Sequence, residues 1–379
     1  MPATNKQLTP DNSVHPGQVL RDALNKMGIK QKDLALRIDV TEKHISSVIQ
    51  GKNSITADFA IRLERALNES AACWLERQRN FDEAVARKQL LQNAKRSLDV
   101  KKKILAEFDY ADLIQVGYVP NATGADEKII FLEQFFGVIN LRLVTKLYPA
   151  AFKNTGSTDT NKGAVAAWLR AGQLVSSGVR VGSLDLKQVR RIASWAPMSY
   201  MQSPTLREDV QRIKKELANY GVVLLVMRQP TNSGIKGSTQ WLRKRVVVQV
   251  SLHDQYADEF WFTLLHELAH VVLHDRGTFV DCDDSARSMI EQAADQQAWD
   301  WLIYPKRYEQ IISRSDFSRE YILNFSGNNK YMSGILVNRL QNDGLIPPGR
   351  FNSLRIKRRL SEEKPVNSAL IDSSFGVLY

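Results

Sequence analysis

Apolar positions through most of the chain recur every three or four residues, the spacing that places them on one face of an α-helix. Between residues 14 and 96 this pattern is divided by Gly and Pro residues and by the capping residue Thr56. The helices predicted there cover 16–28, 31–38, 41–50, 57–67 and 71–96. Further on, the pattern predicts a loop at 121–126 and mostly helix over 128–215, with a polar Gly/Ser/Thr loop at 153–163.

The pattern changes after residue 215, where runs of β-branched residues replace the helical spacing. The runs 222–227 and 245–252 have the composition of buried strands, and a Gly-containing segment joins them. Helical spacing returns over about 257–275 and 285–303, and Pro305 ends the second of these helices. These changes divide the chain into four predicted segments, which are 14–96, 97–215, 216–310 and 311–379.

Composition limits the classes of function that the chain can have. Of its 379 residues, 43% are hydrophobic and 25% are charged, and no apolar run is long enough to cross a bilayer. The polar start MPATNKQLTPDNS lacks the apolar core of a signal peptide, so we expect a cytoplasmic protein without membrane attachment. The two cysteines, Cys73 and Cys282, form no CxxC pair, which argues against a disulfide framework. Any metal ion is therefore expected to be held by His and carboxylate side chains.

The net charge of +11 is concentrated at the two ends of the chain. Residues 1–96 carry 16 Lys/Arg against 11 Asp/Glu, and residues 330–379 carry 8 against 4, which leaves +2 for the middle. Basic ends can attract a nucleic-acid backbone, although surplus Lys and Arg also simply keep a protein in solution. The basic tail RIKRRL (355–360) is interpreted as a solvated helix end rather than a second DNA contact.

Residues 31–50 have the pattern of two helices joined by a tight turn, which is the arrangement of a helix-turn-helix. In that motif the second helix presents polar side chains from its N-terminal part to the major groove of DNA. Here Ile45, Val48 and Ile49 face the core, and polar residues occupy the start and the outward face. A plain helical bundle with a polar solvent face would show the same periodicity. The candidate DNA contacts are Gln31, Thr41, Glu42, Lys43, His44 and Ser47.

The stretch 15–96 resembles the HigA branch of the Cro/phage-repressor (XRE) helix-turn-helix family. The resemblance rests on the opening HPG, the run ITADFAIRLERAL and the sequence WLERQ before a long helix. One departure is Asp39, which stands where the family commonly has Gly at a turn position with positive φ, a backbone that Asp tolerates. The resemblance implies a homodimer that binds operator DNA, represses its own promoter and neutralises a toxin encoded beside it.

The run FWFTLLHELAHVVLHDRG (260–277) places three of the chain's six histidines on one predicted helix. Successive members of the series His266, His270 and His274 lie about 40° apart around a helix, and apolar residues cover the opposite side. Two imidazoles four residues apart can bind one zinc ion, and Glu267 beside them can take a proton from a zinc-bound water. The alternative is a chance HExxH in a core helix, and the clustering of scarce histidines argues against it.

A catalytic zinc ion needs a third protein ligand, and the next helix offers one. In SARSMIEQAADQQAWDWLIYP one stripe contains Glu291, Ala294, Asp295 and Ala298. The alanines permit a close approach to the histidine helix, so that Glu291 can complete a His₂Glu set. Asp295 can hold a histidine by its second ring nitrogen. The alternative for these carboxylates is an ordinary solvated helix face.

Residues 215–305 resemble the ImmA/IrrE family of zinc metallo-endopeptidases. The resemblance rests on GIKGSTQWL, VVVQVSL, the HELAH helix and EQAADQQAWDWLIYP, and the upstream AAWLRAGQL resembles a region of HigA-type fusion proteins. Many members have a second Glu at the position of Ala293 and Phe at that of Gln297, differences that affect packing more than the metal. The resemblance implies a zincin-like α+β domain of gluzincin type, with the HExxH and ExxA(N/D) motifs on the residues named above.

Other parts of a peptidase site are marked less clearly. His274 is a candidate electrophile for the oxyanion, although it could equally be a structural partner at the helix end, and Tyr304 is a weaker candidate. The strand 245–252 is a candidate edge to which an extended substrate adds.

The sequence therefore predicts a multidomain protein, with an all-α helix-turn-helix domain followed by an α+β zincin-like domain that binds Zn²⁺. The leading hypothesis is a DNA-binding regulator whose endopeptidase domain cleaves a protein partner, either a repressor or a component of a toxin system. The second hypothesis is a HigA-type antitoxin and autorepressor whose peptidase-like domain is mainly a scaffold for binding a toxin or a ligand.

Overall fold

A computed structural model describes residues 14–93, 98–152, 161–200, 206–231, 233–251, 256–282 and 288–357. Internal contacts divide the chain after Leu98 into unit 1, which contains the predicted helix-turn-helix, and unit 2, which starts at Asp99. Among the described helices, none combines the length and the apolar character that crossing a membrane requires.

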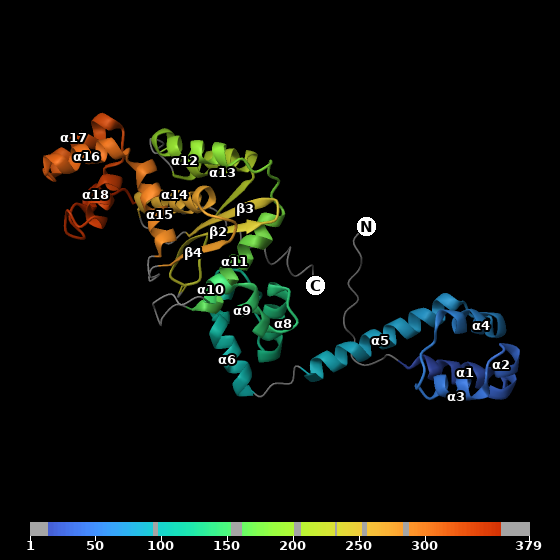
Figure 1. The fold of residues 1–379 in the computed structure, drawn as a ribbon. Helices are drawn as coiled ribbons and strands as arrows, with labels where there is room; N and C mark the ends of the chain where they lie inside the picture. Colours follow the sequence, from blue (N-terminus) through green and yellow to red (C-terminus); the bar gives the residue numbers. More distant parts are fainter. Residues whose placement is uncertain are drawn as a thin grey trace. The chain divides into compact units, whose positions relative to one another are not determined.

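The described part of unit 1 is helical (Figure 1, blue). Its helices are α1 (Pro16–Met27), α2 (Gln31–Arg37), α3 (Glu42–Ile49), α4 (Ala57–Leu67) and α5 (Ala71–Asn93). They agree with the predicted helices, except that residues 94–96 of the last one lie outside the described residues. One core holds the unit together, and its largest fully buried side chains include Leu20, Leu34, Ile45, Leu63 and Trp74.

The turn between α2 and α3 has the backbone that the sequence predicted for Asp39. Its φ is +55°, in the left-handed region. Arg62 of α4 fixes the turn by donating hydrogen bonds to the carbonyl oxygens of Ile38 (3.0 Å) and Asp39 (3.4 Å). The hydroxyl of Thr41 then caps α3 by accepting from the backbone N–H of His44 at 3.2 Å. Tertiary bonds and a cap therefore set the angle between the two helices of the motif.

Unit 2 contains helices before and after a small sheet (Figure 1). Those before it are α6 (Leu98–Phe108), α7 (Tyr110–Gln115), α8 (Ala125–Phe136), η1 (Leu141–Leu143), α9 (Val144–Leu147), α10 (Pro149–Phe152), α11 (Lys162–Ser177), α12 (Leu186–Tyr200) and α13 (Leu206–Asn219). The later helices, one of which follows the third strand directly, are α14 (Ala257–Leu273), α15 (Met289–Leu302), α16 (Pro305–Arg314), α17 (Arg319–Asn329), α18 (Ser333–Asn342) and η2 (Asn352–Leu354). Most of the loop predicted at 153–163 and the first residues of the helix predicted at 285–303 lie outside the described residues.

The strands of the described residues form one mixed sheet. They are β1 (Val222–Met227), β2 (Ile235–Leu242), β3 (Arg245–Ser251) and β4 (Thr278–Cys282), in the spatial order β1-β3-β2-β4. β3 pairs in parallel with β1 and antiparallel with β2, which pairs antiparallel with β4. The structure therefore corrects two predictions. The Gly-containing connection is the strand β2, and β3 lies inside the sheet, where it has no free edge for a substrate. The sequence analysis did not predict β4, which is at the end of the described sheet.

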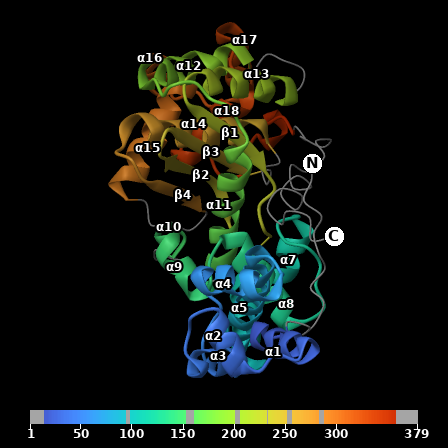
Figure 2. The same cartoon turned by 90° about the vertical axis from the view of Figure 1, so that its right-hand side faces the viewer.

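Alternate side chains of the strands enter two different cores, one on each face of the sheet (Figure 2). Residues 222, 224 and 226 of β1 pack with α12 to α18, whereas residues 223, 225 and 227 pack with α6 to α11. Both faces are covered, which explains why β1 and β3 are almost continuously apolar. Unit 2 is thus a small mixed sheet between two groups of helices, and the region predicted to be a connection contributes to both cores.

The described start of the basic tail, residues 355–357, is not helical, which corrects the helix end that the sequence predicted there. Arg355 is buried and donates to both Asp258 (2.6 Å) and Glu259 (2.6 Å) at the start of α14. Lys357 forms a β-bridge with Tyr256. Residues 358–360 of the predicted tail lie outside the described residues. The segment before them is therefore anchored to the helix that carries the histidines.

Candidate metal centre and nucleic-acid interface

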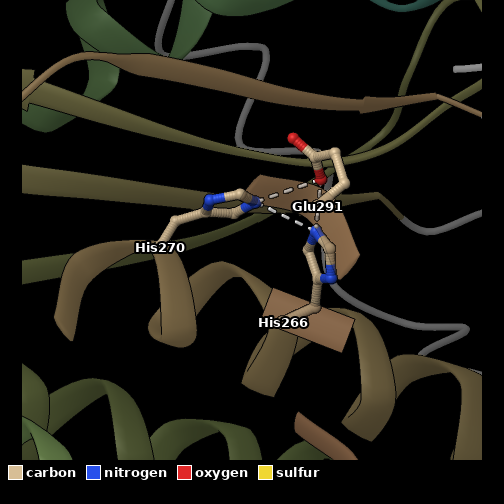
Figure 3. Close-up of side chains that lie close together, drawn as sticks. All are labelled: His266, His270 and Glu291. Carbon is tan, nitrogen blue, oxygen red and sulfur yellow. Dashed lines mark hydrogen bonds and ion pairs between the residues drawn. The ribbon is translucent and has the colours of Figure 1, made fainter. Parts of the chain in front are cut away.

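The histidine helix α14 and the helix α15 pack against each other as the sequence predicted. Ala294 and Ala298 of α15 have no exposed surface, so small side chains line the contact. Ser288 caps α15 by accepting from the backbone N–H of Glu291 at 3.3 Å. The helix therefore begins at Met289, two residues before Glu291, whose side chain points toward α14 (Figure 3).

Three side-chain atoms converge between the two helices (Figure 3). Nε2 of His266 lies 3.0 Å from Nε2 of His270 and 3.1 Å from Oε2 of Glu291. Nε2 of His270 lies 3.3 Å from Oε2 of Glu291. Bonds of about 2.0–2.1 Å to a tetrahedral zinc ion place its donor atoms about 3.3–3.4 Å apart. The donor set and its spacing therefore fit one zinc ion, and Glu291 lies where the sequence predicted a third ligand.

The remaining ring nitrogens of both histidines have partners that orient the rings. Nδ1 of His266 lies 2.9 Å from Oδ1 of Asp295, as the sequence predicted. Nδ1 of His270 lies 3.0 Å from Nδ1 of His274, and Phe279 of β4 stacks on the His270 ring at 4.5 Å between centroids. His274 therefore contacts the ring nitrogen of His270 that faces away from Glu291, the position of a partner that orients the ring, and its role as an electrophile stays a prediction.

Tyr304, the weaker candidate electrophile, stands at the N-cap of α16 and is 58% exposed. Its backbone N–H donates to the hydroxyl of Tyr331 at 3.4 Å, and its carbonyl oxygen accepts from the backbone N–H groups of Arg307 and Tyr308. Its role as an electrophile stays a prediction.

Glu267 lies between α14 and the sheet and is completely buried. The hydroxyl of Thr239 on β2 is 2.7 Å from Oε2 of Glu267 and donates to it. A Cβ atom on Gly237 would come within 2.4 Å of Oε1, so only glycine leaves room for this carboxylate. Burial raises the pKa of Glu267 well above its ordinary value, against the opposing effect of His266. The carboxyl group is thus held beside His266, in an environment that favours its protonated form.

Asp281 on β4 is a site residue that the sequence analysis missed. It pairs across the sheet with Gly237, and its carboxylate, Glu267 and His266 offer ligand atoms that all lie within 4.8 Å of one another. Burial raises the pKa of Asp281, while His266 and Lys236 oppose the shift. The segment TFVDC shows no regular alternation of apolar and polar residues that would have marked a strand, and β2, its neighbour in the sheet, was itself read as a connection.

The electrostatics of the three donors reflect their mutual contacts. Burial alone would lower the pKa of His266, but its hydrogen bonds with Asp295 and Glu291 outweigh this effect and raise the pKa well above its ordinary value. Burial lowers the pKa of His270. Burial would raise the pKa of Glu291, but hydrogen bonds from His266 and His270 lower it to about 2. The metal-free site therefore holds a proton on His266 opposite an ionised Glu291.

In unit 1 the predicted DNA contacts differ in exposure. Thr41, Glu42 and Lys43 are exposed at the start of α3, where a recognition helix presents its side chains. Gln31 is partly exposed at the first position of α2. Ser47 is also partly exposed. The contact proposed for His44 stays a prediction: its ring packs edge-on against Phe59 at 4.9 Å between centroids and, like Gln31 and Ser47, it is partly exposed.

Comparison with known proteins defines the class of unit 1. Residues 20–72 match the profile of a family described as helix-turn-helix. Unit 1 therefore contains a helix-turn-helix domain of Cro/XRE type, in agreement with α2, the turn at Asp39 and α3.

The relatives of this domain include proteins of antitoxin type. Virulence-associated protein I of Dichelobacter nodosus is 35% identical over 71 residues, which are 18% of this chain and 66% of that protein. The chain thus spans just under two thirds of the length of this relative. A solved structure of the Pseudomonas aeruginosa antitoxin HigA with the higBA promoter is 28% identical and covers 23% of this chain and 99% of its own, with a TM-score of 0.20. An addiction module antidote protein of a HigA family from Coxiella burnetii is 25% identical, with coverage of 23% and 97% and a TM-score of 0.22.

Proposed function

We propose that the protein is a DNA-binding, antitoxin-like regulator whose second unit is a zinc-dependent endopeptidase. The enzymatic part of the proposal rests on one observation, the convergence of Nε2 of His266, Nε2 of His270 and Oε2 of Glu291. These three atoms lie between 3.0 and 3.3 Å from one another. Three protein donors with a glutamate beside them are the set used by zinc hydrolases. The resemblance of residues 215–305 to ImmA/IrrE endopeptidases supports the same function.

The residues around the donors have separate tasks in peptide hydrolysis. A zinc ion bound to the three donors supplies Lewis acidity, which polarises the scissile carbonyl and lowers the pKa of a water molecule. Glu267 accepts the proton of the attacking water and passes it to the leaving amine. Thr239 and Gly237 hold Glu267 in place, and Asp295 keeps the His266 ring oriented. In place of β3, the strand β4 is the edge along which an extended substrate is proposed to lie.

Metal analysis and a cleavage assay test the enzymatic part. Full-length protein should hold about one equivalent of zinc, and His266→Ala should lose it. Glu267→Gln should keep the zinc but cleave a random peptide library at least about 100-fold more slowly, because the general base is removed. Asp300→Asn, a carboxylate on α15 bonded to Gln296, is the matched control and should retain both properties.

The scaffold hypothesis makes a different prediction for the same samples. Stoichiometric zinc in the wild type, with no cleavage of the library above the level of Glu267→Gln, would show a binding domain rather than an enzyme. Zinc content below about half an equivalent and unchanged in His266→Ala would reject the metal centre itself.

The DNA-binding part rests on unit 1 and its relatives. We propose that a homodimer of the chain binds operator DNA through α3 and that a cognate toxin is a further partner. A mobility-shift assay on the DNA upstream of the gene should show binding that weakens with salt. Lys43→Ala should reduce the slope of log K against log salt by about one, if Lys43 contacts a phosphate. Gln31→Ala should weaken binding without changing that slope.

Arg79→Ala is the matched control for charge, because Arg79 is an exposed cation on α5 whose side chain is 71% exposed. It should bind like the wild type. Binding that is absent, or that does not depend on salt, would reject an operator role.

A further inference from the structure

A second set of metal-binding atoms overlaps the three donors already described. His266, Glu267 and Asp281 offer ligand atoms that all lie within 4.8 Å of one another, on the side of the site that faces the sheet. This second set shares only His266 with the first set, which consists of His266, His270 and Glu291. Asp281 belongs to no HExxH or ExxA(N/D) motif, and the edge strand β4 brings it to the site.

A buried and unsatisfied oxygen points to a ligand in this second set. Glu267 has no exposed surface, and among the described residues its Oε1 atom has no hydrogen-bond partner. A buried carboxylate oxygen without a partner carries a large desolvation cost, which a cation removes. The missing side chain of Gly237 leaves room for Oε1, and Gly237 pairs across the sheet with Asp281.

The shared histidine limits the two sets to one ion at a time. Nδ1 of His266 is engaged with Asp295 at 2.9 Å, so only Nε2 remains to bind a metal. One imidazole nitrogen has a single lone pair and binds a single ion. An ion held by His266, His270 and Glu291 leaves Glu267 free, whereas an ion held by His266, Glu267 and Asp281 occupies the base.

We propose that His266, Glu267 and Asp281 form a second, alternative position for a divalent cation, in which the site is catalytically silent. The first position has two nitrogen donors and one oxygen, which suits zinc. The second has one nitrogen and two carboxylate oxygens, which shifts the preference toward harder ions such as Mn²⁺. The existence of the second position is independent of peptidase activity, and only its silencing effect rests on the proposed function.

Cobalt titration of the metal-free, full-length protein tests the second position directly. Visible absorption of Co²⁺ reports its ligands without any substrate. Glu291→Ala removes the first position and should still bind about one equivalent of Co²⁺, with an affinity lowered about 10- to 100-fold and a changed spectrum. Asp281→Ala should bind one equivalent with the spectrum of the first position. The double variant should bind none, and Asp300→Ala should behave like the wild type.

Manganese provides a second measurement that does not depend on Glu291. Because the second position is richer in oxygen, Asp281→Ala should weaken Mn²⁺ binding by a larger factor than Co²⁺ binding. Wild-type binding with no binding in a folded Glu291→Ala variant overturns the second position and leaves the proposed zinc centre intact. Equal binding by Glu291→Ala and the double variant also overturns it, since Asp281 is then not a ligand. No Co²⁺ binding by the wild type rejects the proposed metal centre together with this inference.

Discussion

Asp295 is the residue through which the affinity of the metal centre can be changed without touching a proposed ligand. Its Oδ1 atom lies 2.9 Å from Nδ1 of His266, so it holds the ring with Nε2 turned toward the other donors. Replacing a partner of this kind typically costs about 10- to 100-fold in metal affinity. Asp295→Asn keeps an oxygen acceptor and loses only the charge. We therefore expect the lower end of the range, about tenfold or 1.4 kcal/mol.

The pH dependence separates this effect from a general disturbance of the site. In the metal-free protein, Asp295 and Glu291 raise the pKa of His266 well above its ordinary value, so this imidazole is protonated near neutral pH. Metal binding must displace that proton. The affinity should therefore rise about tenfold per pH unit and level off once the pH exceeds the pKa of His266. In Asp295→Asn the pKa of His266 is lower, because one of the carboxylates that raise it has been neutralised.

The two consequences of the substitution oppose each other at neutral pH. Asp295→Asn binds metal less tightly than the wild type once His266 is neutral. At neutral pH, however, His266 is protonated in a smaller fraction of the variant molecules, so metal binding has to displace fewer protons. The deficit should be small near pH 7 and reach its full value of about tenfold at high pH, where His266 is deprotonated in both proteins. Competition with a zinc chelator over the pH range measures the affinity, and calorimetry in two buffers of different ionisation enthalpy counts the released protons.

The proton count at neutral pH should be about one for the wild type and smaller for Asp295→Asn. Asp300→Asn is the matched control and should follow the wild-type curve. An equal deficit at every pH, or an unchanged proton count in Asp295→Asn, would refute the assignment of the proton to His266.

Two further substitutions test the surroundings of the site. Gly237→Ala places a Cβ atom 2.4 Å from Oε1 of Glu267 and should displace this carboxylate. The rate of peptide cleavage should therefore fall at least about tenfold, while the zinc content is retained. Loss of zinc instead would mean that the three donor atoms themselves had moved. Arg355→Ala leaves the buried carboxylate of Asp258 without its cation and should lower the free energy of unfolding by about 3–5 kcal/mol in denaturant titrations, and a change below about 1 kcal/mol would contradict the burial of this pair. The matched controls are Gly327→Ala, which has nothing near the added carbon, and Arg350→Ala, which is exposed.

The helical parts of the site could be predicted because their signals are local. The spacing of histidines on α14 and the stripe of Glu291, Ala294 and Ala298 on α15 each depend on one helix, and the structure places them face to face. The turn at Asp39 was equally local, since a tight turn between two helices restricts φ at one residue. Helix caps and helical periodicity were thus sufficient to predict most of the helices of unit 1 and the positions of His266, His270 and Glu291 on their helices.

The sheet could not be predicted to the same degree because its signals depend on contacts distant in the sequence. β2 carries buried polar residues, and Gln240 is satisfied by the carbonyl oxygen of Leu169 on α11 at 3.1 Å. No alternation of apolar and polar residues marks such a strand. The order of the strands could not be predicted from the sequence either, and β3 was therefore taken for an edge strand. The position of Arg355 could not be predicted because it depends on a contact with Asp258, about one hundred residues earlier in the chain.

The distribution of charge around the histidines supports the proposal that this site binds a cation. The carboxylates of Glu267, Asp281, Glu291 and Asp295 surround His266, and burial acts against the ionised form of the first three. Without a metal, a proton on His266 offsets one negative charge, and the raised pKa values of Glu267 and Asp281 favour their protonated forms. A divalent ion offsets two and also gives the unpartnered oxygen of Glu267 a nearby positive charge. Burying these carboxylates without a cation lowers the free energy of unfolding. Binding of a cation to the folded protein would offset this loss of stability.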